Sequence, residues 1–352
     1  MNPVWRAALA ALFVATLAHA QDAPREAFDA TAPVPALPAP LATRGMLLDL
    51  APAGAGLVAA GAHGVLLHAP DGRHWTQADS PVSAMLNRLR FVDARTGWAL
   101  GGDLAILKTT DAGAHWALQH YDGKNGRPLY DAWFADAQHG IAVGAYGNYL
   151  TTDDGGTHWN AQTSALTQMA VHLNRILKLN DGSLLIAGER GLLAQSADGG
   201  AHWRILRSPY TGSFFGALAY GPRGALVFGL RGNIYVSEDV SKSPLATPDE
   251  IESWESRDPP PEGAGGVTYG WRHLANPLAE TLLGGAWQVA DREAVLVGVN
   301  GVVRRVQLPQ GLVSGAPPAM GECLSAVLVR DGRGLAAGRR GLQDLGPLTE
   351  KD

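Results

Sequence analysis

Four aspartate–histidine pairs recur along the chain and are the first side chains to consider for acid, base or metal chemistry. Carboxylates and imidazoles are general acids, general bases and zinc ligands. Because the pairs occupy equivalent points of a repeat, they cannot meet around one ion or one substrate. We therefore predict no catalytic residue, no metal site and no cofactor, and interpret the aspartates as turn caps. The pairs end segments of the form D-x-x-H-W or D-x-x-x-H-W and are Asp71 with His74, Asp111 with His115, Asp154 with His158, and Asp198 with His202.

A recurring G-x-x-G motif holds side chains that are better suited to binding. No hairpin requires arginine, yet three of the seven variable positions are arginine, and the guanidinium fork pairs with carboxylates and phosphates. We predict a basic arc that takes an acidic peptide segment or lipid headgroups. The alternative is that the arginines pair with carboxylates of the protein itself, such as Glu189 or Asp131. The residues before the second glycine, or its equivalent, are His63, Leu104, Tyr146, Arg190, Arg231, Asn300 and Arg340, with Arg339 beside the last.

The elements that must position these residues repeat every 41 to 44 residues. A period of this size, with turn residues locked to an aromatic, indicates a repeat of small sheets. In the fourth repeat, four short apolar runs alternate with glycine-rich turns, which predicts the four antiparallel strands of one β-propeller blade. The repeats end on Trp75, Trp116, Trp159 and Trp203, and the four apolar runs are 176–179, 184–187, 192–196 and 203–206.

Seven G-x-x-G hairpins predict an all-β fold, a seven-bladed β-propeller of four-stranded antiparallel blades over residues 46–352. One gap between hairpins is longer, which indicates an insertion at 239–269 in blade five, with a helix start and capping box at 247–250. The last repeat ends without a fourth strand. We expect the N-terminal segment 21–45 to supply it, from within residues 28–41. The hairpins begin at Gly61, Gly102, Gly144, Gly188, Gly229, Gly298 and Gly338.

The G-x-x-G hairpins join the second and third strands of each blade, so they should share one face with the loops that connect the blades. The loop 121–130 belongs to this face and contains Tyr121, Lys124 and Arg127. Tyrosine and basic side chains on a rigid scaffold suit a recognition element. A solvated connection is the alternative interpretation.

The first twenty residues are typical of a cleaved signal peptide. Arg6 is their one charge, an apolar run spans 7–17, and Ala18-His19-Ala20 predicts cleavage before Gln21. Such a run is too short to cross a bilayer, and the rest of the sequence offers no transmembrane span. We therefore expect a periplasmic or secreted protein.

Composition narrows the function classes further. The chain has 352 residues, a formal net charge of −5 and one cysteine, Cys323, in an apolar run. This acidic balance argues against a nucleic-acid partner, and a single cysteine allows no internal disulfide. We expect a monomer with a buried, structural thiol.

Two stretches carry a family resemblance. Residues 91–101 follow the pattern F-x-D-x-x-x-G-W-A-x-G and lead into 108–116, and residues 134–144 lead in the same way into 151–159. Both resemble the photosystem II stability/assembly factor family, whose members are exported seven-bladed propellers with bacterial-neuraminidase-type repeats, or Asp-boxes. The resemblance implies a non-enzymatic role in holding a membrane protein or complex during its assembly.

We therefore predict a non-catalytic, exported binding protein that acts through the face carrying the G-x-x-G hairpins. Its expected partner is a membrane protein or envelope complex. The first alternative is a sialidase-like glycoside hydrolase, because sialidases also carry Asp-boxes. That alternative needs an arginine cluster with a tyrosine–glutamate pair, and the sequence places no such pair opposite the arc. A third possibility is a structural partner that docks through the insertion.

Overall fold

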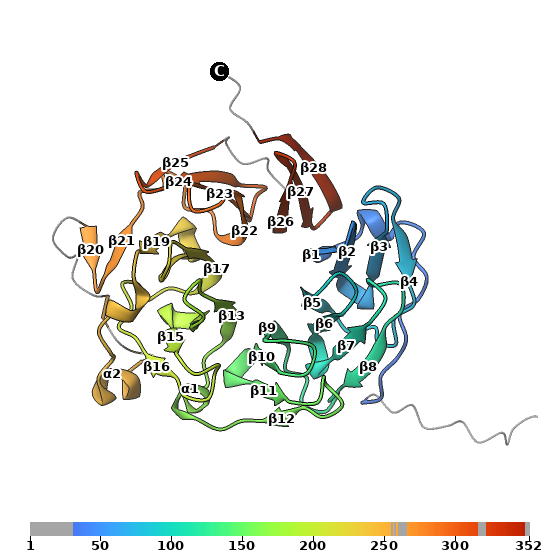
Figure 1. The fold of residues 1–352 in the computed structure, drawn as a ribbon, viewed down its shortest axis with the longest axis horizontal. Helices are drawn as coiled ribbons and strands as arrows, with labels where there is room; N and C mark the ends of the chain where they lie inside the picture. Colours follow the sequence, from blue (N-terminus) through green and yellow to red (C-terminus); the bar gives the residue numbers. More distant parts are fainter. Residues whose placement is uncertain (1–30, 255, 257, 260–265, 316–321, 349–352) are drawn as a thin grey trace, which may run out of the picture. The chain divides into compact units, whose positions relative to one another are not determined.

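Seven small antiparallel sheets surround a central axis in the computed structural model, which describes residues 31–254, 256, 258–259, 266–315 and 322–348 (Figure 1). All seven sheets lie in the compact unit formed by residues 33–352. The predicted all-β, seven-bladed β-propeller is thereby confirmed. The predicted signal peptide 1–20 and its cleavage site lie outside the described residues. Within the described part of the chain, no helix is long and apolar enough to cross a membrane.

The first strand of each blade lies nearest the axis (Figure 1), and each of these strands contacts the next around the ring, with β26 beside β1. Blades one to three comprise β1 (Leu47–Ala53), β2 (Gly56–Gly61), β3 (Leu66–Ala69) and β4 (Thr76–Ala78); β5 (Leu86–Phe91), β6 (Gly97–Gly101), β7 (Ile106–Thr109) and β8 (Ala117–His120); and β9 (Leu129–Phe134), β10 (Gly140–Gly144), β11 (Tyr149–Thr152) and β12 (Asn160–Ala161). Blade four comprises β13 (Leu173–Lys178), β14 (Leu184–Gly188), β15 (Leu193–Ser196) and β16 (Arg204–Ile205).

Blade five comprises β17 (Phe214–Tyr220), β18 (Gly224–Gly229), β19 (Ile234–Ser237), β21 (Trp271–His273) and the additional β20 (Val267–Thr268). Blade six comprises β22 (Leu282–Val289), β23 (Glu293–Gly298), β24 (Val303–Gln307) and β25 (Leu312–Ser314), and blade seven β26 (Leu324–Arg330), β27 (Arg333–Gly338) and β28 (Gly341–Pro347). A one-turn helix, α1 (Ala165–Gln168), precedes blade four.

The hydrophobic core lies between neighbouring blades. Second strands such as β6, β10 and β14 are buried at every residue, since each of their faces packs against another sheet. This explains why they are continuous apolar runs without alternation. Between blades two and three, the rings of Trp98 and Phe134 stack at 3.7 Å.

The G-x-x-G hairpins contain a pair of residues in the left-handed region. In six blades the residue at the third position of the hairpin has φ between 53° and 58°. In five of these six blades the next residue is a glycine. At Gly64 a Cβ would collide with the carbonyl oxygen of Val82, so glycine is required there. Blade two departs by one position from our alignment. Asp103 (φ 54°), not Leu104, matches His63, and Leu104 replaces the second glycine.

The insertion in blade five joins β19 to β21 and adds β20 to the sheet. Its helix α2 (Pro248–Glu252) has the predicted capping box. The Thr247 hydroxyl accepts a hydrogen bond from the Glu250 amide, and the Glu250 carboxylate accepts one from the Thr247 amide. Arg207 of the blade-four-to-five connection pairs with Glu250 at 2.8 Å, and Trp254 is buried against the core of blade four. The insertion is therefore docked on the propeller.

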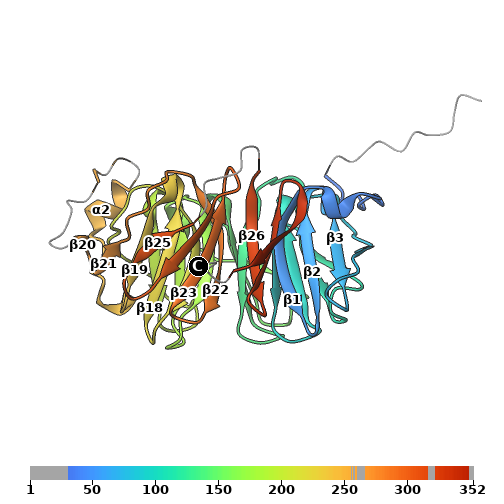
Figure 2. The same cartoon turned by 90° about the horizontal axis from the view of Figure 1, so that it is seen from above.

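Blade seven has three strands within the described residues, and the expected closing strand is not among them. Residues 31–41 form no strand there, and residues 28–30 lie outside the described part. The segment runs instead along blade one (Figure 2, dark blue beside β3), where Ala36 donates to the carbonyl of Ser80 and Gln77 bonds Leu37 and Ala39. Prolines at 33, 35, 38 and 40 explain the error, because proline donates no ladder hydrogen bond.

Candidate functional site

The residues of the predicted arc lie on separate hairpins at one end of the ring. Arg340 pairs with Glu322 at 2.7 Å, which is the kind of internal pairing that we considered as the alternative. Asp131, which the same alternative named, is buried near the axis and pairs with Arg88, Arg90 and Arg175. Glu189 accepts a hydrogen bond from the amide of His172. His63, Tyr146, Arg231, Asn300, Arg339 and Arg340 are exposed, and Arg190 is half-buried.

The loop 121–130 adds a small aromatic cluster to the same end. Arg127 lies 5.3 Å from the centre of the Tyr146 ring, and that ring contacts His172 edge-on at 4.8 Å. The Tyr121 hydroxyl donates to Asp103 at 3.3 Å, while Lys124 is exposed. The structure thus brings together Arg127 and Tyr146 from the predicted set, and leaves the arginines of the hairpins on different blades.

A second group of charged residues, which the sequence analysis did not single out, lies on the inner strands of blades one to four. We call it the axial cluster: Asp49 on β1, Arg88 and Arg90 on β5, Asp131 on β9 and Arg175 on β13. Asp131 pairs with Arg90 at 2.5 Å, with Arg175 at 3.4 Å and with Arg88 at 3.6 Å, and Arg88 also contacts Asp49 at 3.5 Å. One carboxylate therefore holds three guanidinium groups.

The two carboxylates also join neighbouring blades. Asp49 accepts a hydrogen bond from the amide of Leu89, and Asp131 accepts one from the amide of Ile176. Both amides belong to the inner strand of the following blade. These aspartates therefore have two roles: they join neighbouring blades, and they hold the arginines in place.

The electrostatics of the axial cluster favour an anion. Burial alone would raise the pKa of Asp131, but Arg90, Arg175 and Arg88 hold it below its usual range. Burial lowers the pKa of Arg175 to about 9, against the pull of Asp131. Three arginines face two carboxylates, so the cluster carries one positive charge in excess. The Nε of Arg175 is buried and has no hydrogen-bond partner among the described residues, so it is desolvated without a compensating hydrogen bond.

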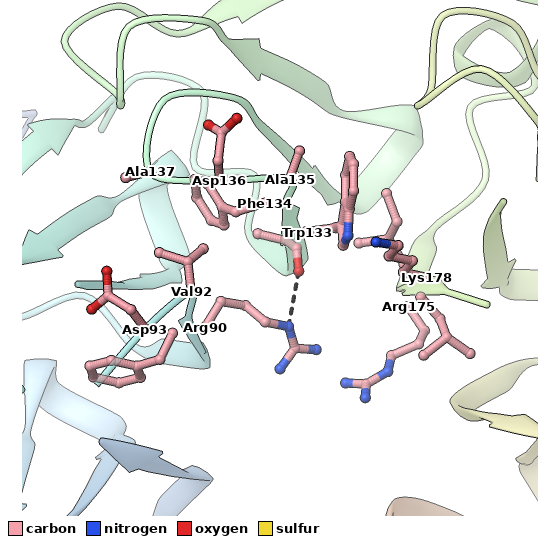
Figure 3. Close-up of a pocket in the computed structure, with 14 residues that line it drawn as sticks. Arg90, Val92, Asp93, Trp133, Phe134, Ala135, Asp136, Ala137, Arg175 and Lys178 are labelled. Carbon is pink, nitrogen blue, oxygen red and sulfur yellow. Dashed lines mark hydrogen bonds between the residues drawn. The ribbon is translucent and has the colours of Figure 1, made fainter. Parts of the chain in front are cut away.

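A pocket of about 640 Å³ opens directly beside this cluster. Its residues come from β5, β9 and β13 and from the turns that follow them, and Arg90 and Arg175 form part of its wall (Figure 3). Figure 3 shows both guanidinium groups directed toward the same space, with Trp133 and Lys178 above Arg175. We call it the arginine pocket. It lies at the opposite end of the ring from the G-x-x-G hairpins, because the first and second strands are joined there.

Comparison with known proteins identifies the relatives of this chain. The family model described as "Photosynthesis system II assembly factor YCF48" matches residues 124–253, which contain the whole of blades three and four. The resemblance to the photosystem II assembly factor family is confirmed. A solved structure of "YCF48 bound to D1 peptide" is 17% identical, covers 90% of this chain and all of its own, and has a TM-score of 0.63. No curated protein matches the sequence.

Two further solved structures have the same fold at low sequence identity. YCF48 from Cyanidioschyzon merolae is 15% identical, with 87% of this chain and 96% of its own covered and a TM-score of 0.63. The WD40 propeller domain of Doa1 is 10% identical, with 89% and 94% covered and a TM-score of 0.58. At these identities the likeness shows the fold, which proteins outside the assembly factor family share.

The Asp-box turns that this family carries are built as structural caps here. In the third repeat, Asp154 accepts hydrogen bonds from the His158 amide and the Thr152 hydroxyl, both at 2.9 Å, and contacts the His158 ring at 2.6 Å. The Thr152 hydroxyl accepts a further bond from the amide of Gly156. The same pattern recurs in the second and fourth repeats. Across the described residues, no three histidine, cysteine or acidic side chains gather as a metal site.

These turns predict an acid transition. Desolvation opposes ionisation of Asp111, but hydrogen bonds from His115 lower its pKa to about 2, and backbone hydrogen bonds from His158 and His202 lower the pKa of Asp154 and Asp198 well below the usual range. A carboxylate with a depressed pKa stabilises the fold fully above its unfolded pKa of about 3.9, and loses this contribution as the pH falls toward 2. We expect the melting temperature to fall steeply below pH 4.

The measurement is the melting temperature by circular dichroism from pH 7 to pH 2. Replacing Asp111, Asp154 and Asp198 together by asparagine should lower it at pH 7 and flatten its fall in acid. Asp153→Asn is the control, because the exposed Asp153 accepts no hydrogen bond within the described residues. An unchanged acid profile in the triple variant would show that the acid transition lies elsewhere.

Proposed function

We propose that this protein is a non-catalytic, exported binding protein that holds a segment of a membrane protein or envelope complex during assembly. The arginine pocket is the proposed binding site, in place of the hairpin face that the sequence analysis favoured. The bound segment is an extended peptide with a carboxylate, from an acidic side chain or a chain end, directed at Arg90 and Arg175. Lys178 adds a third cation and Trp133 an apolar wall at the rim.

The observation that carries this proposal is the excess positive charge in the wall of the pocket. Arginine pairs with carboxylates in a bidentate geometry, and a partly buried site strengthens that pairing. The volume of about 640 Å³ suits a few residues of a peptide. The related YCF48 structure contains a D1 peptide, which supports a peptide as the ligand class for this chain also.

The arrangement of side chains argues against the sialidase-like alternative. A sialidase needs a tyrosine nucleophile with a glutamate partner beside its arginines. The arginine pocket and the adjoining axial cavity have neither tyrosine nor glutamate in their described linings. The Asp-box turns are structural caps, so they give no independent reason to expect hydrolysis.

A pair of substitutions at the pocket tests the proposal. Arg175→Gln with Lys178→Glu should reduce crosslinked capture of a membrane protein from native envelope membranes at least tenfold. The melting temperature should stay close to that of the wild type, because Asp131 keeps Arg88 and Arg90, and Lys178 is exposed. The readout is a pull-down of the tagged mature protein with identification of the captured chain.

The matched control is Arg190→Glu with Arg231→Glu on the hairpin face, which should capture the same protein as the wild type. The opposite pattern, with loss in the hairpin variant and full capture by the pocket variant, would return the site to the hairpin face. Capture of nothing by the wild type would count against the binding function itself.

A further inference from the structure

The segment before the first blade exposes an unusual amount of apolar surface. Residues 31–43 contain no charged side chain, and four of them are proline. The exposed fractions are 81% for Leu37, 65% for Leu41 and 47% for Val34, and Met46, which follows the segment, is 42% exposed. Single exposed leucines are ordinary, but a continuous group of this kind marks an interaction surface.

This surface is held in place. The hydrogen bonds of Ala36 and Gln77 fix the backbone of the segment on blade one, while Ala39 and Ala42 pack into the core between blades seven and one. The large side chains are therefore directed outward from a rigid support. They line an apolar hollow of about 800 Å³ that also includes Ala62 and His63, so it lies at the hairpin end of the ring.

Basic side chains border the apolar group. Arg44 follows it directly and Arg339 lies on the hairpin of blade seven; both are exposed, and neither has an ion pair among the described residues. Arg340 is balanced by Glu322, and the exposed Asp79 precedes Ser80, whose carbonyl holds Ala36. These three arginines and two carboxylates leave a positive excess at this edge of a chain whose net charge is −5.

We propose that this surface docks the propeller on an anionic lipid bilayer. We call it the docking surface, made of Val34, Leu37, Leu41 and Met46 with Arg44 and Arg339. Protruding leucines insert into the boundary between headgroups and acyl chains, and cations beside them attract anionic headgroups. Leu37 is 81% and Leu41 65% exposed although both border the hollow, so both protrude as such anchors do. The arginine pocket would then face away from the membrane.

Flotation with lipid vesicles tests the docking surface. The mature protein, residues 21–352, should float with vesicles of phosphatidylglycerol and phosphatidylethanolamine, and less with phosphatidylcholine vesicles. Leu37→Asp with Leu41→Asp should lower binding at least tenfold without moving the melting temperature, because both side chains are exposed. Arg44→Glu with Arg339→Glu should lower binding to the anionic vesicles only.

The matched control is Leu312→Asp, since Leu312 is 60% exposed on β25 and lies outside the docking surface. It should bind vesicles as the wild type does. The proposal is overturned if the wild type stays at the bottom of the gradient, or if the double leucine variant floats equally well. It is also overturned if the wild type sediments as a dimer that this variant makes monomeric, because the occupant would then be a second copy.

Discussion

Replacing Asp131 by alanine is expected to lower the free energy of unfolding by about 3–5 kcal/mol, the usual cost of leaving buried charges uncompensated. Asp131 is fully buried and contacts Arg88, Arg90 and Arg175. Its removal leaves three guanidinium groups close together with only Asp49 to balance them. It also deprives the amide of Ile176 of its acceptor, which weakens the joint between blades three and four.

Chemical denaturation followed by tryptophan fluorescence measures this loss. Asp131→Asn should cost less, because the amide oxygen can still accept from Ile176. Adding Arg175→Gln to Asp131→Ala should recover part of the stability by removing one unpaired cation. A loss below about 1 kcal/mol, the range of exposed ion pairs, would mean that the arginines are compensated by other groups or by water.

Replacing Trp98 by alanine is expected to cost a similar amount, about 3–5 kcal/mol, for a different reason. Trp98 on β6 is completely buried, stacks on Phe134 of the next blade, and donates from its indole to Gln119 at 2.9 Å. Alanine would leave a large cavity between two blades and an unpaired amide oxygen.

The control for this substitution is Trp159→Ala. Trp159 contacts the same Phe134 edge-on at 6.0 Å but is only half-buried, so its loss should cost clearly less. Thermal and chemical unfolding of both variants give the comparison. Equal losses in the free energy of unfolding would contradict the prediction that the buried, stacked Trp98 stabilises the contact between the blades more than Trp159 does.

The parts of the fold that the sequence predicts correctly are those that repeat or that use local chemistry. Each blade joins its second and third strands by the same kind of tight hairpin, so seven hairpins indicate seven blades. The capping box of Thr247 and Glu250 involves only neighbouring residues, and it too was predictable. The position of the N-terminal segment was not predictable in this way. Residues 31–41 are held by hydrogen bonds to Gln77 and Ser80, which lie about 40 residues further along the chain.

The axial cluster shows why the candidate site was harder to predict. Arg88 and Arg90 alternate with the buried Leu89, and Arg175 precedes the buried Ile176, so a period of two was present as a signal. Strand alternation places these arginines on the axis only when the inner strand of each blade is known. That three of them meet at Asp131 also depends on the arrangement of blades two, three and four around the ring.

Site-specific photo-crosslinking in living cells tests the central claim most directly. A photoreactive residue would be placed at Lys178, on the rim of the arginine pocket, or at Tyr146, at the opposite end of the ring. We predict a crosslink from position 178 to a segment of a membrane protein, and none from position 146 to that protein. A crosslink to the client from position 146 alone would contradict the assignment of the binding site to the arginine pocket.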